Sequence, residues 1–219
     1  MDNSAKVTAR RSTIEDWTGA LAESTGSPGG GAASGVMLAI AYSLTSMVAG
    51  YTSVDGDPGD ELTALRRRAV SGRETALGLA DRDAAASETF GSAFRLERGK
   101  GREEAIREAS VQAAEASAAL GAQGTEVVGD LEWLTRHGNP ALIADVAVAC
   151  GALRAAIAGA RTNVSFDLGS LTSRGETLAQ VRARHPVLWR TVHELDAVLE
   201  RIDRLSAEIE GRTAPPSDE

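Results

Sequence analysis

The spacing of apolar residues predicts helices along the whole chain, and no segment shows the two-residue period of a strand. Ser12 and Glu15 fit a capping box, with Ser12 as N-cap of a short helix that ends before Thr25. A run without charged side chains follows from Ala32 to Thr52, built mostly of Ala, Gly, Ser, Leu, Val and Met. This run predicts a buried helix that ends near Tyr51.

Two long amphipathic helices are predicted next. Helical spacing of Leu and Ala indicates a helix over about 60–96, and Gly99–Gly101 ends it. The next helix is expected over about 102–136, with a possible kink near Gly121 or Gly124.

The last third of the chain holds a second apolar helix and an amphipathic one. The apolar helix is predicted over about 140–163, after the helix stop at His137–Pro140. Residues 164–173 are interpreted as a turn into the last helices. Pro186 is expected to start or kink the final helix, which runs to about Gly211, and residues 213–219 are expected to be a disordered tail.

No repeat or interdomain linker interrupts this pattern, so the sequence predicts one all-α domain over residues 1–219, with a helical-bundle core over about 12–211. Aromatic residues are only 4% of the chain, so its buried area must come from many small side chains on closely packed helices.

The two apolar helices raise the question of assembly. A helix that is apolar all round is either central in its bundle or shared with a partner. We expect a homodimer in which one or both helices contribute to the interface, and the alternative is a monomer with a thick core. Several Ser residues, three glycines and the lack of flanking basic residues argue against a membrane span at Ala32–Thr52.

Charge and cysteine content narrow the class of protein. The net charge of −8 and the pI near 5.0 argue against nucleic acid and anionic membranes as partners. Cys150 is the single cysteine, which excludes an intrachain disulfide and a cysteine-based zinc site. The three histidines have no metal-ligand spacing, so no metal is expected. With no visible signal peptide, a cytoplasmic location is expected.

The segment Ser27-Pro28-Gly29-Gly30-Gly31 precedes the first apolar helix and is the strongest candidate for a binding loop. Pro fixes one backbone angle, and three glycines leave the next residues free. The N-terminus of the following helix presents N–H groups that can bind an anionic or carbonyl-bearing ligand. The structural alternative is that the glycines let two helices pack closely.

Four segments in order resemble the cyclodeaminase domain of formiminotransferase-cyclodeaminase and the free-standing methenyltetrahydrofolate cyclohydrolases of the same fold. They are residues 27–34 with 39–48, residues 79–84, residues 138–149 and residues 158–164. The resemblance covers about residues 12–205. It implies an all-helical, dimeric protein that uses no metal and no organic cofactor beyond its tetrahydrofolate-derived substrate.

The resemblance implies hydrolysis of the 5,10-methenyl bridge of tetrahydrofolate. Water attack on an amidinium carbon and protonation of the departing nitrogen need one or two carboxylates as general acid and base. Asp83 and Asp145 are the candidates. Burial would raise their pKa toward neutrality.

The substrate-binding candidates are the residues of the glycine loop and three polar residues of the later segments. The two Asn side chains offer a donor and an acceptor side by side for a pterin amide edge, and glycine backbone can approach a flat ring. The set is Ser27, Pro28, Gly29, Gly30, Gly31, Asn139, Asn163 and Asp167.

Each candidate also has a purely structural interpretation. Asp83 lies on a charged helix and could belong to a solvated face. Asp145 could cap a helix or pair with Arg154 or Arg161, and Asn139 precedes a Pro in a common N-cap arrangement. Asp167, where the family has Asn, could be a helix cap.

Two other activities stay open. The turn Asp55–Asp60 is acidic where the family usually carries Lys or Arg, which favours a repurposed member that acts on or binds a non-folate cyclic imine or amidine. Elimination of ammonia from formiminotetrahydrofolate is the other alternative. The absence of a fused formiminotransferase domain favours the cyclohydrolase.

Overall fold

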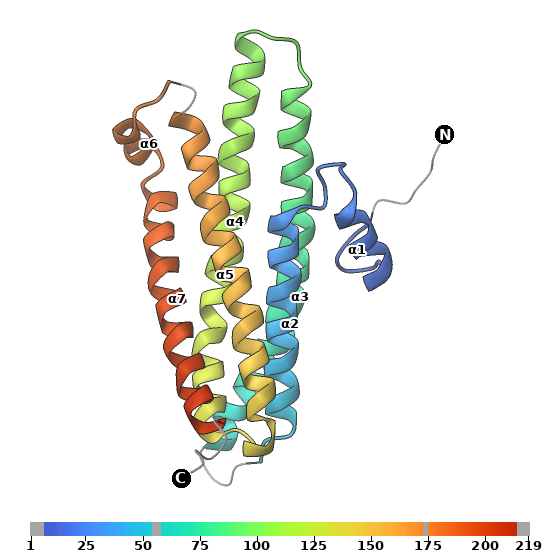
Figure 1. The fold of residues 1–219 in the computed structure, drawn as a ribbon, viewed down its shortest axis with the longest axis vertical. Coiled ribbons are helices and arrows are strands. Elements are labelled where there is room, and N and C mark those ends of the chain that lie inside the picture. The colour runs from blue at the N-terminus through green and yellow to red at the C-terminus, as the bar shows by residue number, and fades with distance from the viewer. Residues whose placement is uncertain (1–6, 54–57, 173–174, 214–219) are drawn as a thin grey trace, which may run out of the picture.

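The computed structural model describes residues 7–53, 58–172 and 175–213 (Figure 1). Within these ranges the chain forms seven α-helices and one short 3-10 helix, with no strand. The predicted all-α fold is confirmed.

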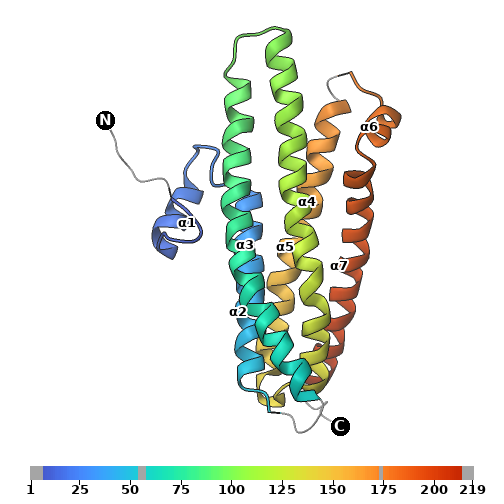
Figure 2. The ribbon, with the colours of Figure 1, turned by 180° about the vertical axis from the view of Figure 1, so that it is seen from behind.

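Five long helices form two layers. One layer holds α2 (Gly30–Gly50), α5 (Ile143–Thr172) and α7 (Pro186–Thr213), which face the viewer in Figure 1. The other holds α3 (Pro58–Phe94) and α4 (Lys100–His137), which face the viewer in Figure 2. Helix α5 is central because it packs against α2, α4 and α7.

Small elements surround the bundle: α1 (Ile14–Ala22), the 3-10 helix η1 (Pro140–Leu142) and α6 (Leu178–Arg184). Helix α1 lies outside α3 in both views (Figures 1 and 2). Its N-cap is Thr13, whose hydroxyl accepts from the Asp16 N–H, so the prediction of Ser12 was wrong by one residue. The Ser12 hydroxyl instead accepts from the Thr8 N–H.

Helix α2 packs closely because its neighbours meet it at small residues. A methyl group on Gly35 would lie 2.7 Å from the Ala80 Cβ of α3, too close for any real contact. A methyl group on Gly159 of α5 would overlap the Ser34 hydroxyl in the same way. These close approaches let α2 bury small residues against two helices at once.

Helix α5 is longer than predicted. Residues 164–172 continue the helix, and the interpretation of this segment as a turn was wrong over the part that the structure describes. Val164, Leu168 and Leu171 keep the helical spacing and are buried together with Val181 and Leu188. Burial of this apolar face outweighs the weak helix propensity of the Ser, Phe, Asp and Gly residues between them.

Helix α4 continues as one helix through Gly121 and Gly124, the two positions at which the sequence allows a kink. The side chain of Leu195 packs against Gly121, and the side chain of Ile157 packs against Gly124. Cys150 is fully buried in the main core, as expected for a small apolar side chain.

Two predictions fall partly or wholly outside the described residues. Helix α7 ends at Thr213, so the prediction of a disordered tail was wrong for that residue, and the rest of the predicted tail, residues 214–219, lies outside the described residues. Of the acidic turn, the structure describes only its end, where Pro58, Gly59 and Asp60 begin α3.

Both apolar runs are long and apolar enough to cross a membrane by length and composition: Gly30–Gly50 and Pro140–Thr172. In the bundle α2 and α5 lie side by side, and their facing residues belong to the main core. Each of the two helices also carries exposed apolar residues.

Candidate active site

Two buried carboxylates meet at the N-terminal end of α2. Asp83 comes from α3 and Asp167 from α5, and they are 5% and 8% exposed. Their charges interact strongly enough for Asp83 to raise the pKa of Asp167. Arginine or lysine is the usual partner of a buried carboxylate, and no ion pair to either Asp is found among the described residues.

Asp83 is held by the first turn of α2. Its carboxylate accepts from the Ala32 N–H, one of the donors that an α-helix leaves unpaired at its start. The Ser117 hydroxyl of α4 lies 3.5 Å from its Oδ1. Burial raises the pKa of Asp83, and these two donors oppose the increase because they favour the ionised form. The interpretation of Asp83 as part of a solvated face is therefore wrong.

Asp167 has no comparable donor in the described part of the chain. Burial, together with the smaller effect of the Asp83 charge, raises the pKa of Asp167 to about 7. Near neutral pH the pair therefore holds one proton for part of the time. Asp83 has the better-stabilised anion, so the shared proton resides mainly on Asp167. Such a pair can take one proton and donate another.

The glycine loop makes this arrangement possible. A methyl group on Gly31 would overlap the carboxylate of Asp83, so the contact requires glycine. Gly29 is the N-cap of α2 and supplies no side-chain cap, which leaves the Ala32 N–H for Asp83. The Ser27 hydroxyl donates to the Ala84 carbonyl of α3 at 2.8 Å, and Pro28 is buried. The loop is thereby fixed against the helix that carries Asp83.

Asn163 lies on the same face of α5 as Asp167, one helical turn away. One further turn along that face is Gly159, which contacts Ser34 of α2. Asn163 is half-buried between these two points. The structure therefore brings together Asp83, Asp167, Asn163 and the loop Ser27–Gly31 at one end of the α2–α5 pair.

Asn139 and Asp145 lie at the opposite end. The Asn139 side chain caps η1 by accepting from the Ala141 N–H at 3.0 Å, and its amide donates to the Tyr51 carbonyl at 3.2 Å. Asp145 is half-buried in the first turn of α5. At 1.5 Å per residue, Asp145 and Asp167 are about 33 Å apart along α5.

Within one chain, therefore, the structure does not bring Asp145 to Asp83. The physical reason is that α5 runs antiparallel to α2, so its first turn meets the C-terminal end of α2. The proposed pairing of Asp145 with an arginine of α5 is not seen either. Arg154 pairs with Asp203 and Arg161 with Asp196, both on α7. A catalytic role of Asp145 stays a prediction.

Sequence reasoning missed Ser117 and the pairing of Asp167 with Asp83. Ser117 is 2% exposed, within an Ala-rich face of α4. A polar residue on an apolar helix face is the signal that could have pointed to it. The pairing of the two Asp residues depends on how α3 and α5 lie in space, which no local pattern reports.

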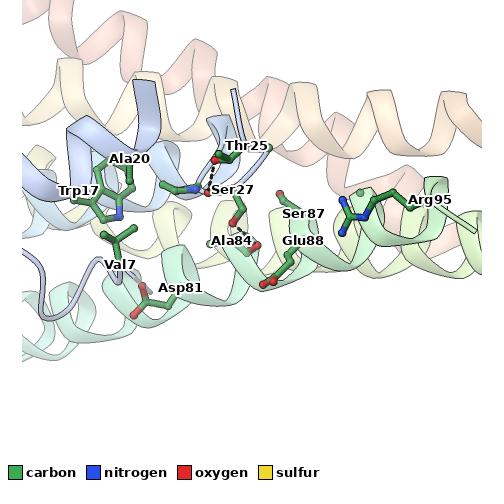
Figure 3. Close-up of a pocket in the computed structure, with 13 residues that line it drawn as sticks. Val7, Trp17, Ala20, Thr25, Ser27, Asp81, Ala84, Ser87, Glu88 and Arg95 are labelled. Carbon is green, nitrogen blue, oxygen red and sulfur yellow. Dashed lines mark hydrogen bonds between the residues drawn. The ribbon is translucent and has the colours of Figure 1, made fainter. Parts of the chain in front are cut away.

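A cavity of about 570 Å³ lies on the other side of the loop, between α1 and α3 (Figure 3). Trp17 and Ser27 line it from the α1 side, and Asp81, Glu88 and Arg95 line it from α3. Ser27 and Pro28 belong to both regions, so the loop separates this cavity from the carboxylate pair. Among the described residues, no three His, Cys, Asp or Glu side chains group in a way that could hold a metal ion.

Comparison with known proteins identifies the family. The sequence profile of the formiminotransferase-cyclodeaminase family matches residues 13–184. No curated protein sequence matches the chain. The fold is similar to the crystal structure of formiminotetrahydrofolate cyclodeaminase from Thermotoga maritima, with a TM-score of 0.78 and 23% sequence identity over 93% of this chain and 98% of that chain. The profile covers most of the chain and includes both carboxylates and the glycine loop, so the protein belongs to the formiminotransferase-cyclodeaminase family.

Proposed function

We propose that this protein hydrolyses the methenyl bridge of 5,10-methenyltetrahydrofolate, with Asp83 as the general base and Asp167 as the general acid. The observation that carries the proposal is the buried carboxylate pair at the start of α2. Two carboxylates with unequal pKa values in one place can act as general acid and general base near neutral pH.

Asp83 is the proposed base, because the Ala32 N–H and the Ser117 hydroxyl stabilise its anion. It takes a proton from the attacking water while the oxygen–carbon bond forms at the amidinium carbon. Asp167 then donates its proton to the departing nitrogen as the carbon–nitrogen bond breaks. The hydroxyl proton returns to Asp167 when the formyl carbonyl forms, and Asp83 releases its proton to solvent.

The cationic amidinium also explains why an anionic pair suits this substrate. A positive charge next to Asp83 favours the ionised carboxylate and offsets the cost of its burial. Asn163 is the proposed hydrogen-bonding partner of the pterin amide edge, because it lies one turn from Asp167. The loop from Ser27 to Gly31 is the proposed floor for the flat ring.

Elimination of ammonia from formiminotetrahydrofolate is the second candidate. It is favoured by the matching family profile and by the fold of the Thermotoga maritima enzyme, whose name carries that activity. The same pair would serve, because ring closure and protonation of the leaving amine are again proton transfers.

The test is spectrophotometric. Loss of the near-ultraviolet absorbance of methenyltetrahydrofolate is measured against the buffer rate for the wild type, Asp83→Asn and Asp167→Asn. Asp203→Asn is the control, because that carboxylate is half-exposed on α7 and pairs with Arg154. We expect the wild type and the Asp203→Asn control to cause a fast loss of absorbance. Asp83→Asn and Asp167→Asn are expected to show no loss beyond the buffer rate. A wild-type rate equal to buffer would overturn the cyclohydrolase, and ammonia release from formiminotetrahydrofolate would then support the second candidate.

A further inference from the structure

Two cavities adjoin where α6 lies beside the end of α5 and the first turns of α7 (Figures 1 and 2). One has a volume of about 330 Å³ and lies between α5 and α7. The other has a volume of about 620 Å³ and lies between α6 and α7. Trp189 and His193 of α7 line both cavities, so the two form one site, here called the Trp189 site. Small-molecule sites commonly have volumes in this range.

The floor of the Trp189 site is apolar. Leu168 of α5 is buried there, Val192 of α7 is half-buried, and Leu178 of α6 is 59% exposed. The indole of Trp189 is half-buried and meets the His193 ring edge-on, with 6.1 Å between the ring centroids. An aromatic ring of a ligand can pack against Trp189 and cover Leu178, which removes apolar surface from water.

The charged groups around the Trp189 site are basic. Arg161 of α5, Arg182 of α6 and Arg190 of α7 line the cavities, and among the described residues no Asp or Glu does. Arg161 already pairs with Asp196. Arg182 lies over the Trp189 ring at 5.8 Å, and neither Arg182 nor Arg190 has an ion pair within the described part of the chain. Two arginines without an acidic partner favour an anion, although the whole chain has a net charge of −8.

The Trp189 site is on the far side of α5 from the carboxylate pair. Arg161, Ser165 and Leu168 follow one another at helical spacing and line the site. Asp167 points toward Asp83 of α3 instead, because successive residues turn by about 100° around a helix. A ligand in the Trp189 site therefore contacts the turn of α5 that carries Asp167 without reaching its carboxyl group.

The Trp189 site is also largely outside the segment that identifies the family. The family profile ends at residue 184, whereas Trp189, Arg190 and His193 follow it on α7. These three residues supply both rings and one of the two unpaired arginines. The profile match thus gives no reason to assign the site to the folate reaction.

We propose that the Trp189 site binds a small aromatic anion, with its ring against Trp189 and its carboxylate or other anionic group beside Arg182 and Arg190. The ligand contacts α5, α6 and α7 together, so it stabilises the folded protein as its occupancy rises. This binding does not depend on the proposed function, because the carboxylate pair takes no part in it.

The cavity beside α1 differs in charge and provides an internal control. Asp81 and Glu88 line it together with Arg95, so an anion meets two carboxylates there. Trp17 lines that cavity. The third tryptophan, Trp133, stacks on a histidine of α4 and lines neither cavity. The three indoles therefore report on three separate places.

Nuclear magnetic resonance of protein labelled with nitrogen-15 follows the three indole N–H signals during a titration with naphthoate, an aromatic carboxylate. Trp189→Phe and Trp133→Phe assign the signals. We expect a saturable shift of the Trp189 signal, with the signals of Trp17 and Trp133 unchanged. Naphthalenemethanol, the neutral analogue, is expected to bind at least tenfold more weakly because it loses the charge-assisted hydrogen bonds. Octanoate, an anion without a ring, is expected to bind several-fold more weakly than naphthoate.

Three results would overturn the proposal. One is a Trp189 signal that does not move at millimolar naphthoate. Another is an equal affinity for naphthoate and for either of the two analogues. The third is a shift confined to Trp17, which would place the probe in the cavity beside α1.

Substitutions locate the anionic group of the probe. Arg182→Gln and Arg190→Gln are each expected to weaken naphthoate binding about tenfold. Arg204→Gln is the matched control, because Arg204 is an exposed arginine of α7 that lines neither cavity, and it should bind naphthoate as the wild type does. Unchanged affinity in both site variants would overturn the proposal. Asp83→Asn is expected to keep the wild-type affinity, and loss of binding in that variant would place the probe at the carboxylate pair and contradict a separate site.

Discussion

Two buried carboxylates on neighbouring helices have very different surroundings. Asp130 of α4 and Asp83 of α3 are both 5% exposed. The Asp130 carboxylate accepts hydrogen bonds from two nitrogens of Arg68, the shorter at 2.6 Å. Arg68 also donates to Glu61. Asp83 has only a backbone N–H and a distant hydroxyl as donors in the described part of the chain, and its charge raises the pKa of a second carboxyl group, that of Asp167.

The difference separates a structural charge from a reactive one. An arginine partner stabilises the ionised form of Asp130 and opposes the increase in pKa that burial causes, although burial still leaves the pKa of Asp130 raised. The pKa values of Asp83 and Asp167 are raised by burial, and no cation among the described residues opposes that increase. A protein tolerates such an arrangement when the unsatisfied charge has a use, such as proton transfer to a cationic substrate.

The largest expected effect is on catalysis. Asp83→Asn removes the proposed base and is expected to lower kcat/KM for methenyltetrahydrofolate by about 10²–10⁴-fold, the usual contribution of a general base. The fold should survive, because the amide oxygen can still accept from the Ala32 N–H. Steady-state kinetics and circular dichroism check both statements. Wild-type kcat/KM in this variant would remove Asp83 from the mechanism.

The second prediction concerns stability and pH. The pKa of Asp167 is about 7 in the folded protein, against about 3.9 in an unfolded chain. Between these values the unfolded state loses a proton that the folded state keeps, so the free energy of unfolding falls as pH rises from about 4 to 7. The stabilising contribution of the protonated form is fully present below pH 4.

Asp167→Asn removes that dependence because the amide stays neutral. We expect the variant to be more stable than the wild type by roughly 2–4 kcal/mol at pH 8 and equally stable near pH 4. Urea denaturation at the two pH values measures the difference. The same offset at both pH values would show that folding does not raise the pKa of Asp167.

Asp130→Asn should behave in the opposite way. Loss of the charge-assisted bonds to Arg68 is expected to cost about 1.5–3 kcal/mol of stability near pH 7, with kcat/KM unchanged while the protein is folded. Denaturant unfolding and kinetics on the same sample give both values. A loss of activity as large as that of Asp83→Asn would erase the distinction between the two sites.

The smallest expected effect comes from the loop. Gly31→Ala introduces a methyl group that overlaps the Asp83 carboxylate, so we expect a loss of about 1–3 kcal/mol of stability together with lower activity. Gly129→Ala is the matched control, because an added methyl group at that α4 position meets nothing within 4 Å. The control is expected to gain up to about 1 kcal/mol. Equal stability of the two variants would show that the loop shifts freely.

The sequence predicted the helices well because their apolar faces repeat with a clear period, as in α3 and α4. It failed at the end of α5, where Ser165, Phe166 and Gly169 hide a buried stripe of Val164, Leu168 and Leu171. There tertiary burial outweighs local propensity, which a single sequence does not reveal.

The candidate site was predicted only in part. The loop and Asp83 were found because they lie in short, recognisable segments. Asp145 was placed beside Asp83, but the antiparallel path of α5 puts Asp167 there instead. Contacts between helices far apart in the chain depend on topology, so Ser117 and the pairing of the two carboxylates became visible only in the structure.

The Asp83–Asp167 pair can serve as acid and base only if one of its carboxyl groups stays protonated near neutral pH. Carbon-13 NMR of protein labelled at the Asp carboxyl carbons would follow each titration from pH 3 to pH 9. We expect one carboxyl signal that titrates near pH 7 in the wild type and is absent in Asp167→Asn. Titration of every Asp carboxyl below about pH 5, within its ordinary range, would contradict it.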